Sequence, residues 1–167
     1  MPVTSTPPER ESGRRSAFDS EKAIRNSEQA FEDMAQNFPT EMRGRRASVD
    51  IHEVMIFDGD AERAKAARVS SLEGSAKNIE DSVSKMQDET LPKVRELDGS
   101  VGVIALADRT SGRVTVITLW ESAEALRQSE QQADRLREQA AKSGGQSIAG
   151  VDRYEVAVVQ QLSGVHA

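Results

Sequence analysis

The amino-acid sequence predicts an α+β fold in which two helices pack on a four-stranded antiparallel sheet. Three observations lead to this class. Apolar residues recur at strand spacing in four segments and at helical spacing in two, the segments follow the order β-α-β-β-α-β, and breaks rich in glycine separate them. The chain has 167 residues, of which 37% are apolar and 30% charged, so it can form one ordinary domain and carry additional segments.

The first strand and the first helix of this unit are expected within residues 65–98. In KAARVSSLEG the side chains alternate between two faces, and Arg68 and Ser70 share one of them. Pro92 falls inside the helix that follows and is expected to kink it, and Asp98-Gly99 ends it. The apolar residues at helical spacing in this helix are Ile79, Val83, Met86, Leu91, Val94 and Leu97.

A hairpin, a second helix and a last strand complete the unit. VGVIALADR and RVTVITLW are strands on either side of the turn DRTSGR. Ser122 is expected to cap the second helix, Glu121 lies near the positive end of its dipole, and Gly144-Gly145 ends it. The last strand is RYEVAVVQ, residues 153–160. The apolar stripe of the second helix is Leu126, Ala133, Leu136 and Ala140.

Both faces of this sheet are apolar, although two helices can cover only one. In the third strand, for example, Val114 and Val116 alternate with Ile117 and Leu119. Sheets that are apolar on both faces are covered on both faces, and leaving one in water would cost roughly several kcal/mol at ~25 cal/mol per Å². We therefore expect a homodimer in which two sheets pack face to face.

The chain divides into four expected parts. They are a disordered tail over residues 1–19, an extension over 20–64, the β-α-β-β-α-β domain over 65–160, and a carboxy-terminal tail over 161–167. The first tail holds three prolines and almost no apolar side chains, so it cannot bury enough surface to offset its chain entropy.

The extension has elements of its own. Asp19 or Ser20 is expected to cap a helix that runs to about Asn37, and Pro39 stops it. VDIHEVMIF, residues 49–57, is expected to form a short strand. Because the helix has a thin apolar face, we expect the extension to wrap the partner subunit or to bind a protein partner.

Composition excludes several classes of function. The net charge of −6 argues against nonspecific binding of nucleic acid, which requires a basic surface. The absence of cysteine excludes disulfides and thiol chemistry, and no apolar run approaches the roughly 18 residues that a membrane span requires. MPVTSTPPERESGRR has no apolar stretch after its polar start, so we expect no secretory signal, no membrane partner and a cytoplasmic location.

Four stretches of the sequence carry a resemblance to a known family: LPKVREL with Asp98-Gly99, ADRTSGRVTVITLWES, EALRQSEQQADRLR and VDRYEVAV. Over residues 66–160 the chain resembles the dimeric α/β-barrel superfamily, which has a ferredoxin-like fold. Within that superfamily it is most similar to antibiotic-biosynthesis-monooxygenase-type domains. The resemblance implies a cavity between the sheet and its helices, and it implies that Trp120 of the WES stretch can line it.

The family includes cofactor-independent oxygenases of aromatic polyketides, haem-degrading enzymes and proteins with no known reaction. In the haem-degrading branch an axial histidine lies in the second helix, where this chain has Ser129, Glu130 and Gln131. The only histidines, His52 and His166, match no such position, so we expect no haem and no other cofactor.

The oxygenase branch uses an asparagine or tryptophan together with a tyrosine. Trp120 and Tyr154 are therefore candidates for a ligand pocket, and Ser70 and Ser71 lie where an asparagine would be expected. The alternatives are that Trp120 closes the core where a strand meets a helix, and that Tyr154 packs on the sheet with its hydroxyl in water.

Two strand arginines complete the set of candidates. If Arg68 and Arg153 point inward, they can bind a carboxylate or phenolate. If they pair with Glu155 or Glu73, they are structural. The stretch DIHE has one histidine beside acidic residues, which is too weak a pattern to indicate a metal site, and we expect none.

Two functions are compatible with these observations. The first is a small-ligand-binding or interaction module of the antibiotic-biosynthesis-monooxygenase type without a recognisable catalytic set. The alternative is a cofactor-independent monooxygenase that acts on a small aromatic or polyketide-like substrate, so whether the chain is an enzyme stays open.

Overall fold

The computed structural model describes residues 20–37 and 50–159. The chain separates into two compact units, Met1–Val49 and Asp50–Ala167, which are described here one at a time. The predicted tails over 1–19 and 161–167 and the predicted stop at Pro39 lie outside the described residues.

The described part of the first unit is one helix, α1 (Glu21–Gln36), as predicted. The backbone N–H of Ala23 donates a hydrogen bond of 3.2 Å to the hydroxyl of Ser20, so Ser20 provides the cap that was expected from Asp19 or Ser20. An exposed ion pair joins Arg25 to Glu21 one turn away. Most of the predicted apolar stripe of this helix lies outside the described side chains.

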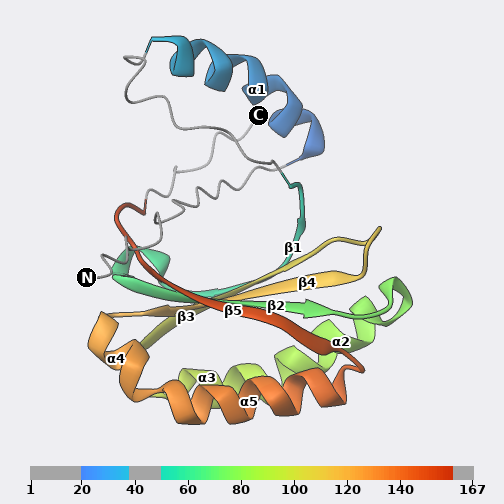
Figure 1. The fold of residues 1–167 in the computed structure, drawn as a ribbon, viewed down its shortest axis with the longest axis vertical. Coiled ribbons are helices and arrows are strands. Elements are labelled where there is room, and N and C mark those ends of the chain that lie inside the picture. Colours follow the sequence, from blue (N-terminus) through green and yellow to red (C-terminus); the bar gives the residue numbers. More distant parts are fainter. Residues whose placement is uncertain (1–19, 38–49, 160–167) are drawn as a thin grey trace, which may run out of the picture. The chain divides into compact units, whose positions relative to one another are not determined.

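The second unit is built on a five-stranded sheet in which all neighbouring strands are antiparallel (Figure 1). The strand order is β1-β3-β4-β2-β5. The predicted α+β class and ferredoxin-like order are confirmed for β2 to β5 and their helices. The strands are β1 (Glu53–Gly59), β2 (Ala66–Glu73), β3 (Ser100–Ala107), β4 (Arg113–Trp120) and β5 (Ser147–Glu155).

The fifth strand comes from the segment that we expected to form a strand of the extension. β1 lies at one edge of the sheet and pairs with β3 from Glu53 opposite Ala107 to Gly59 opposite Gly102. The prediction of a strand is confirmed there, but the sheet has five strands instead of four, because this pairing joins residues more than 40 positions apart and leaves no local sequence signal.

The α-helices of the second unit, α2 to α5, all lie on one face of the sheet (Figure 1). The first predicted helix is broken: a π-helical turn separates α2 from α3, and the N–H of Leu91 donates to the carbonyl of Met86. The turn ends at Thr90, two residues before Pro92, which lacks an N–H and cannot continue an α-helical bond pattern. The helices are α2 (Ile79–Lys85), α3 (Leu91–Arg95), α4 (Ala123–Gln128) and α5 (Glu130–Ser143).

Several predicted boundaries are confirmed. The hydroxyl of Ser122 accepts a 3.0 Å hydrogen bond from the N–H of Ala125 at the start of α4, and Gly144 is the carboxy-terminal cap of α5. Gly112 closes the predicted hairpin turn with a φ of 78°, and a Cβ there would lie 2.1 Å from the carbonyl oxygen of Gly74. Only glycine fits this turn.

The last strand ends earlier than predicted. Its partner β2 begins at Ala66, which lies opposite Glu155. One more bond, from the N–H of Val156 to the carbonyl of Lys65 at 2.9 Å, completes the contact. The prediction of a strand over residues 156–159 was wrong, because no strand in the described part of the chain pairs with them, and residue 160 lies outside the described residues.

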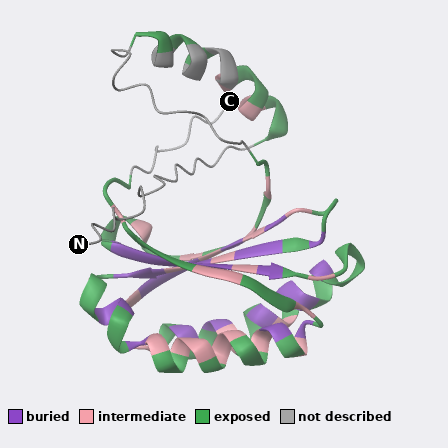
Figure 2. Cartoon of the chain, in the orientation of Figure 1, coloured by how far each residue is buried: buried purple, intermediate pink, exposed green. Residues whose placement is uncertain are grey.

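Both faces of the sheet are apolar, as predicted. Buried residues lie along its strands (Figure 2). The face under the helices holds the larger cluster, which includes Ile56, Leu72, Val103, Ala105 and Val114. The other face holds Ala67, Val69, Ile117 and Leu119, packed with Ala64 and Val101. That two copies of the chain pair through this second face stays a prediction. In the described part of the chain no helix is both long and apolar enough for a membrane span.

Candidate functional site

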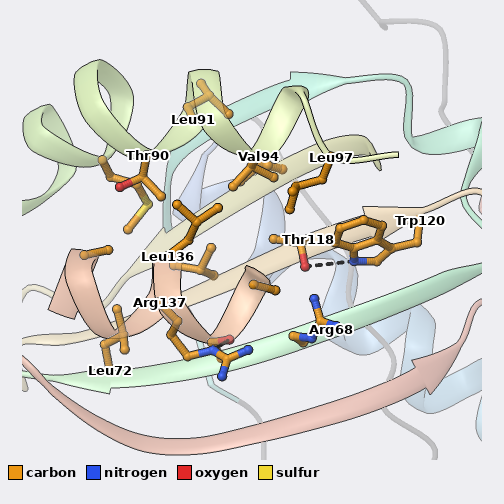
Figure 3. Close-up of a pocket in the computed structure, with 16 residues that line it drawn as sticks. Arg68, Leu72, Thr90, Leu91, Val94, Leu97, Thr118, Trp120, Leu136 and Arg137 are labelled. Carbon is orange, nitrogen blue, oxygen red and sulfur yellow. Dashed lines mark hydrogen bonds between the residues drawn. The ribbon is translucent and has the colours of Figure 1, made fainter. Parts of the chain in front are cut away.

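A cavity lies between the helix-covered face of the sheet and the helices α3 and α5 (Figure 3). About 60 Å³ of it is open to the centre of a water molecule, while one water needs roughly 10–15 Å³ on that measure. It can therefore hold several waters or part of a small ligand. Its apolar wall consists of Leu72, Met86, Leu91, Val94, Leu97, Val103, Val116, Ala133, Leu136 and Ala140. Its other lining residues are Arg68, Ser70, Thr90, Thr118, Trp120 and Arg137.

Trp120 forms the end of this cavity nearest α4. Its side chain is completely buried, and its indole Nε1 donates a 3.0 Å hydrogen bond to the hydroxyl of Thr118 (Figure 3). It also packs in a cluster with Ala66, Ala125 and Leu126, where β4 passes into α4. Trp120 therefore does both of the things weighed from the sequence: it closes the core and it lines a cavity.

Arg68 lies on β2 and points to the same face as Trp120. Only 1% of the residue is exposed, which is rare for an arginine. Its Nη2 donates to the carbonyl of Leu126 at 2.8 Å, to the hydroxyl of Ser129 at 3.3 Å and to the carboxylate of Glu130 at 2.9 Å. Its guanidinium carbon lies 5.3 Å from the centre of the Trp120 ring, within the range of a cation–π contact.

The remaining nitrogens of Arg68 make no hydrogen bond to any residue that the structure describes. Nε and Nη1 are buried and have no hydrogen-bond partner among the described residues. Buried charged donors are nearly always paired, so an unpaired set in a cavity wall needs an explanation. Burial lowers the pKa of Arg68, the positive charges of Arg137 and Arg153 lower it further, and the bond to Glu130 acts in the opposite direction.

Glu130, the first residue of α5, joins Arg68 to Arg153 of β5. The Nε of Arg153 donates to Glu130 Oε2 at 3.0 Å, and a second contact joins Arg153 Nη2 to Oε1. The pKa of Glu130 is lowered to about 2, first by the bond from Arg153 and then by Arg68. The expected pairing of these arginines with Glu155 or Glu73 was wrong, because the strand register places them beside α5, and Glu73 pairs with Arg113.

Ser70 lies two residues along β2 from Arg68 and accepts a 3.0 Å hydrogen bond from the Nε of Arg137. Arg137 Nη1 also donates to Asp134 at 2.6 Å, and only 11% of the Arg137 side chain is exposed. The sequence did not point to Arg137, because charged residues of an amphipathic helix ordinarily lie on its solvent face. Arg137 lies four residues after Ala133 and three before Ala140, both on the apolar stripe. This spacing places it on the helix face that packs against the sheet, and it could have identified the residue from the sequence.

Tyr154 does not line the cavity. In the register between β2 and β5 it lies opposite Ala67, whereas Arg68 lies opposite Arg153. Because side chains alternate along a strand, Tyr154 points to the face away from the helices, where it is 36% exposed. The structure thus brings Trp120, Arg68 and Ser70 together and leaves Tyr154 apart from them.

The lining defines the chemistry that the cavity offers. Arg68, Arg137 and Thr118 carry N–H or O–H donors, and the described residues of the wall include no carboxylate, imidazole or phenol. Within the described ranges no three His, Cys, Asp or Glu side chains gather in a way that could hold a metal ion. The arrangement is therefore equipped to hold and orient a molecule with an apolar body and an acceptor group.

Comparison with known proteins agrees with this fold. No family model matches the chain. The uncharacterized proteins Rv2557 and Rv2558 of Mycobacterium tuberculosis (strain ATCC 25618 / H37Rv) are 30% and 32% identical to it over 95 residues, which cover 57% of this chain. Those residues cover 42% and 40% of the relatives, so the chain spans about two fifths of their length.

Among solved structures, a ferredoxin-fold protein from Listeria monocytogenes related to antibiotic biosynthesis monooxygenases matches with a TM-score of 0.51. The match covers 79% of this chain and 90% of that one at 12% identity, a level that establishes the fold alone. The chain therefore has the ferredoxin-like fold of proteins related to antibiotic biosynthesis monooxygenases, as the sequence resemblance indicated.

Proposed function

We propose that this protein is a small-ligand-binding protein of the antibiotic-biosynthesis-monooxygenase type, and that the cavity under Trp120 is its binding site. One observation carries the proposal: Arg68 lines an apolar cavity, and its buried Nε and Nη1 donors have no acceptor among the described residues. Ligand sites are typically apolar hollows with a few placed polar groups, and this cavity has that composition.

The polar groups that line the cavity favour ligand binding over monooxygenase activity as its function. The guanidinium groups of Arg68 and Arg137 donate hydrogen bonds and accept none, whereas removing a proton from a substrate requires a base. No residue of the lining supplies such a base at neutral pH. The proposed role of the wall is to bind and orient a ligand.

The single tryptophan of the chain allows a direct test, since its emission reports on the cavity. We expect 1-octanol and octanoate, neither of which absorbs where tryptophan is excited, to cause a saturable change in emission. Ala133→Phe should abolish the change by filling the cavity. Gln132→Phe, on the exposed side of the same helix, should leave it intact. A linear or absent response to both compounds in the unmodified protein would contradict the proposal.

We also propose that two copies pair through the sheet face away from the helices. The support is the apolar character of that face, which continues to Phe57 at the edge of the sheet, where the residue is 54% exposed. Light scattering should give twice the mass of one chain. Phe57→Glu should shift the mass toward the monomer, whereas Ile148→Glu, an equally apolar exposed site near the helix-covered face, should not. A monomer for the unmodified chain would refute the pairing.

A further inference from the structure

We infer that the ligand of this cavity is an apolar carboxylic acid, bound as a monoanion, whose carboxylate accepts hydrogen bonds from Arg68. The inference rests on the proposed function, because it specifies what the proposed site binds. Three features of the described residues lead to it: the unused donors of Arg68, the net charge of the groups around it and the apolar remainder of the wall.

The unused N–H donors of Arg68 indicate that the ligand carries a hydrogen-bond acceptor. The two hydrogens of Arg68 Nη2 are shared among three protein acceptors, so this nitrogen is saturated. Nε carries one further N–H and Nη1 carries two, and all three are buried without a partner in the described part of the chain. The side chain is only 2% exposed, so bulk water cannot solvate them. A ligand oxygen in the cavity would provide the hydrogen-bond acceptor that these N–H groups of Arg68 lack.

The charges around Arg68 indicate that this acceptor is an anion with a single charge. Arg68, Arg137 and Arg153 contribute three positive charges, and the carboxylates of their ion pairs, Glu130 and Asp134, contribute two negative charges, so these ion pairs sum to 3 − 2 = +1. Asp152 also acts on Arg153, but it lies opposite Val69 on the other face of the sheet. Arg68 and Arg137 line the cavity, whereas neither carboxylate does. One negative charge in the cavity neutralises the group, and a dianion such as a phosphate monoester would leave it in excess.

The remaining wall selects an apolar body. Aliphatic side chains from β2, β3, β4, α3 and α5 surround the space, and the Trp120 ring closes one end (Figure 3). Among apolar molecules with one acidic group, a carboxylic acid is fully ionised at neutral pH because carboxyl pKa values lie near 4. A simple phenol, with a pKa near 10, is neutral under those conditions and offers fewer acceptor sites.

The test compares octanoate with 1-octanol, which have the same chain length and differ in charge, on the full chain with Trp120 emission as the signal. We expect octanoate to bind on the order of 10- to 100-fold more tightly, as hydrogen bonds to a charged group provide. Arg68→Met should bring the two affinities together. Arg113→Met, which removes an exposed arginine paired with Glu73, should preserve the difference.

Each outcome bears on a different claim. Equal, saturable binding of both compounds to the unmodified protein would overturn the carboxylate inference and leave the proposed binding function standing. No saturable response to either would overturn both. An octanoate preference that survives in a folded Arg68→Met protein would overturn the assignment to Arg68. Circular dichroism shows whether the Arg68→Met variant is folded. The comparison of octanoate with 1-octanol on the unmodified protein tests the carboxylate inference even if that variant does not fold.

Discussion

Two arginine clusters connect strands to helices in this fold, and they differ in burial. In the first, Arg68 and Arg153 surround Glu130 beside the cavity. In the second, Arg109 of the hairpin turn pairs with Glu53 of β1 and, at 2.7 Å, with Glu80 of α2. The side chain of Arg109 is 48% exposed and that of Arg68 is 2% exposed.

The pKa values of the two arginines therefore shift in opposite directions, although both side chains form ion pairs with glutamates. The pKa of Arg109 is raised by its bonds to Glu53 and Glu80, and the burial of this exposed side chain is too slight to offset them. The pKa of Arg68 is lowered, chiefly by burial. Water solvates the surplus charge of the exposed cluster, so that cluster needs no further partner. The cluster around the buried Arg68 has a surplus charge and unused N–H donors that lack a counterion and an acceptor. Only the buried cluster has the properties of a binding site.

The largest difference between the clusters is expected when a carboxylate is removed. Glu130→Gln takes away the counterion of the buried Arg68, and we expect the free energy of unfolding to fall by about 3 kcal/mol, the lower end for a broken buried pair. Glu80→Gln, which removes an exposed partner of Arg109, should leave the urea midpoint almost unchanged. Equal losses in the two variants would remove the distinction between the clusters.

The second difference is in pH dependence. The pKa of Glu130 is lowered from 4.5 to about 2, so its stabilisation is complete above about pH 4.5 and is lost as the pH falls toward 2. The gap in unfolding free energy between the unmodified protein and Glu130→Gln should therefore be largest near neutral pH and close as the carboxylate becomes protonated. Urea titrations at several pH values measure it. A gap that stays constant from pH 6 to pH 2 would contradict the role of the carboxylate charge.

The smallest effect is expected from the surface cluster itself. Arg109→Ala should lower the melting temperature only slightly, and about 1 M salt should erase the difference because it screens exposed charges. The deficit of Glu130→Gln should persist in the same salt, since the Arg68 side of this pair is buried and is screened much less. Thermal melts with and without salt make this comparison. A deficit for Arg109→Ala that resists salt would show that burial does not separate the two clusters.

Local patterns account for the part of the fold that the sequence predicted. Alternation in Ala66–Glu73 and Arg113–Trp120, and helical spacing around Val83, lie within continuous segments and can be read without knowing the partner strands. The place of β1 could not be read in this way, because its pairing with β3 depends on distant residues. The π-helical turn before Pro92 was also missed, since a kink and a π turn have the same sequence signal.

The candidate site was predicted in part for the same reason. Arg68 and Ser70 share a face by strand alternation, and the pairing of Ala66 with Trp120 brings the tryptophan to that face. Tyr154 was placed with them, but its side depends on the register between β2 and β5, and a shift of one residue reverses it. The contacts of Arg137 and Glu130 arise from the packing of α5 on the sheet, which no local pattern encodes.

The central claim is that the unused N–H donors of Arg68 bind the ligand's acid group, and the Nε–H resonance of Arg68 in a ¹⁵N-labelled sample measures this directly. Arg68→Met assigns the signal by its disappearance. We expect saturating octanoate to shift this resonance as a charged hydrogen bond forms, while saturating 1-octanol, which also changes Trp120 emission, leaves it nearly in place. An Arg68 signal that octanoate does not move, or that octanol moves equally, would show that these donors do not bind the acid group.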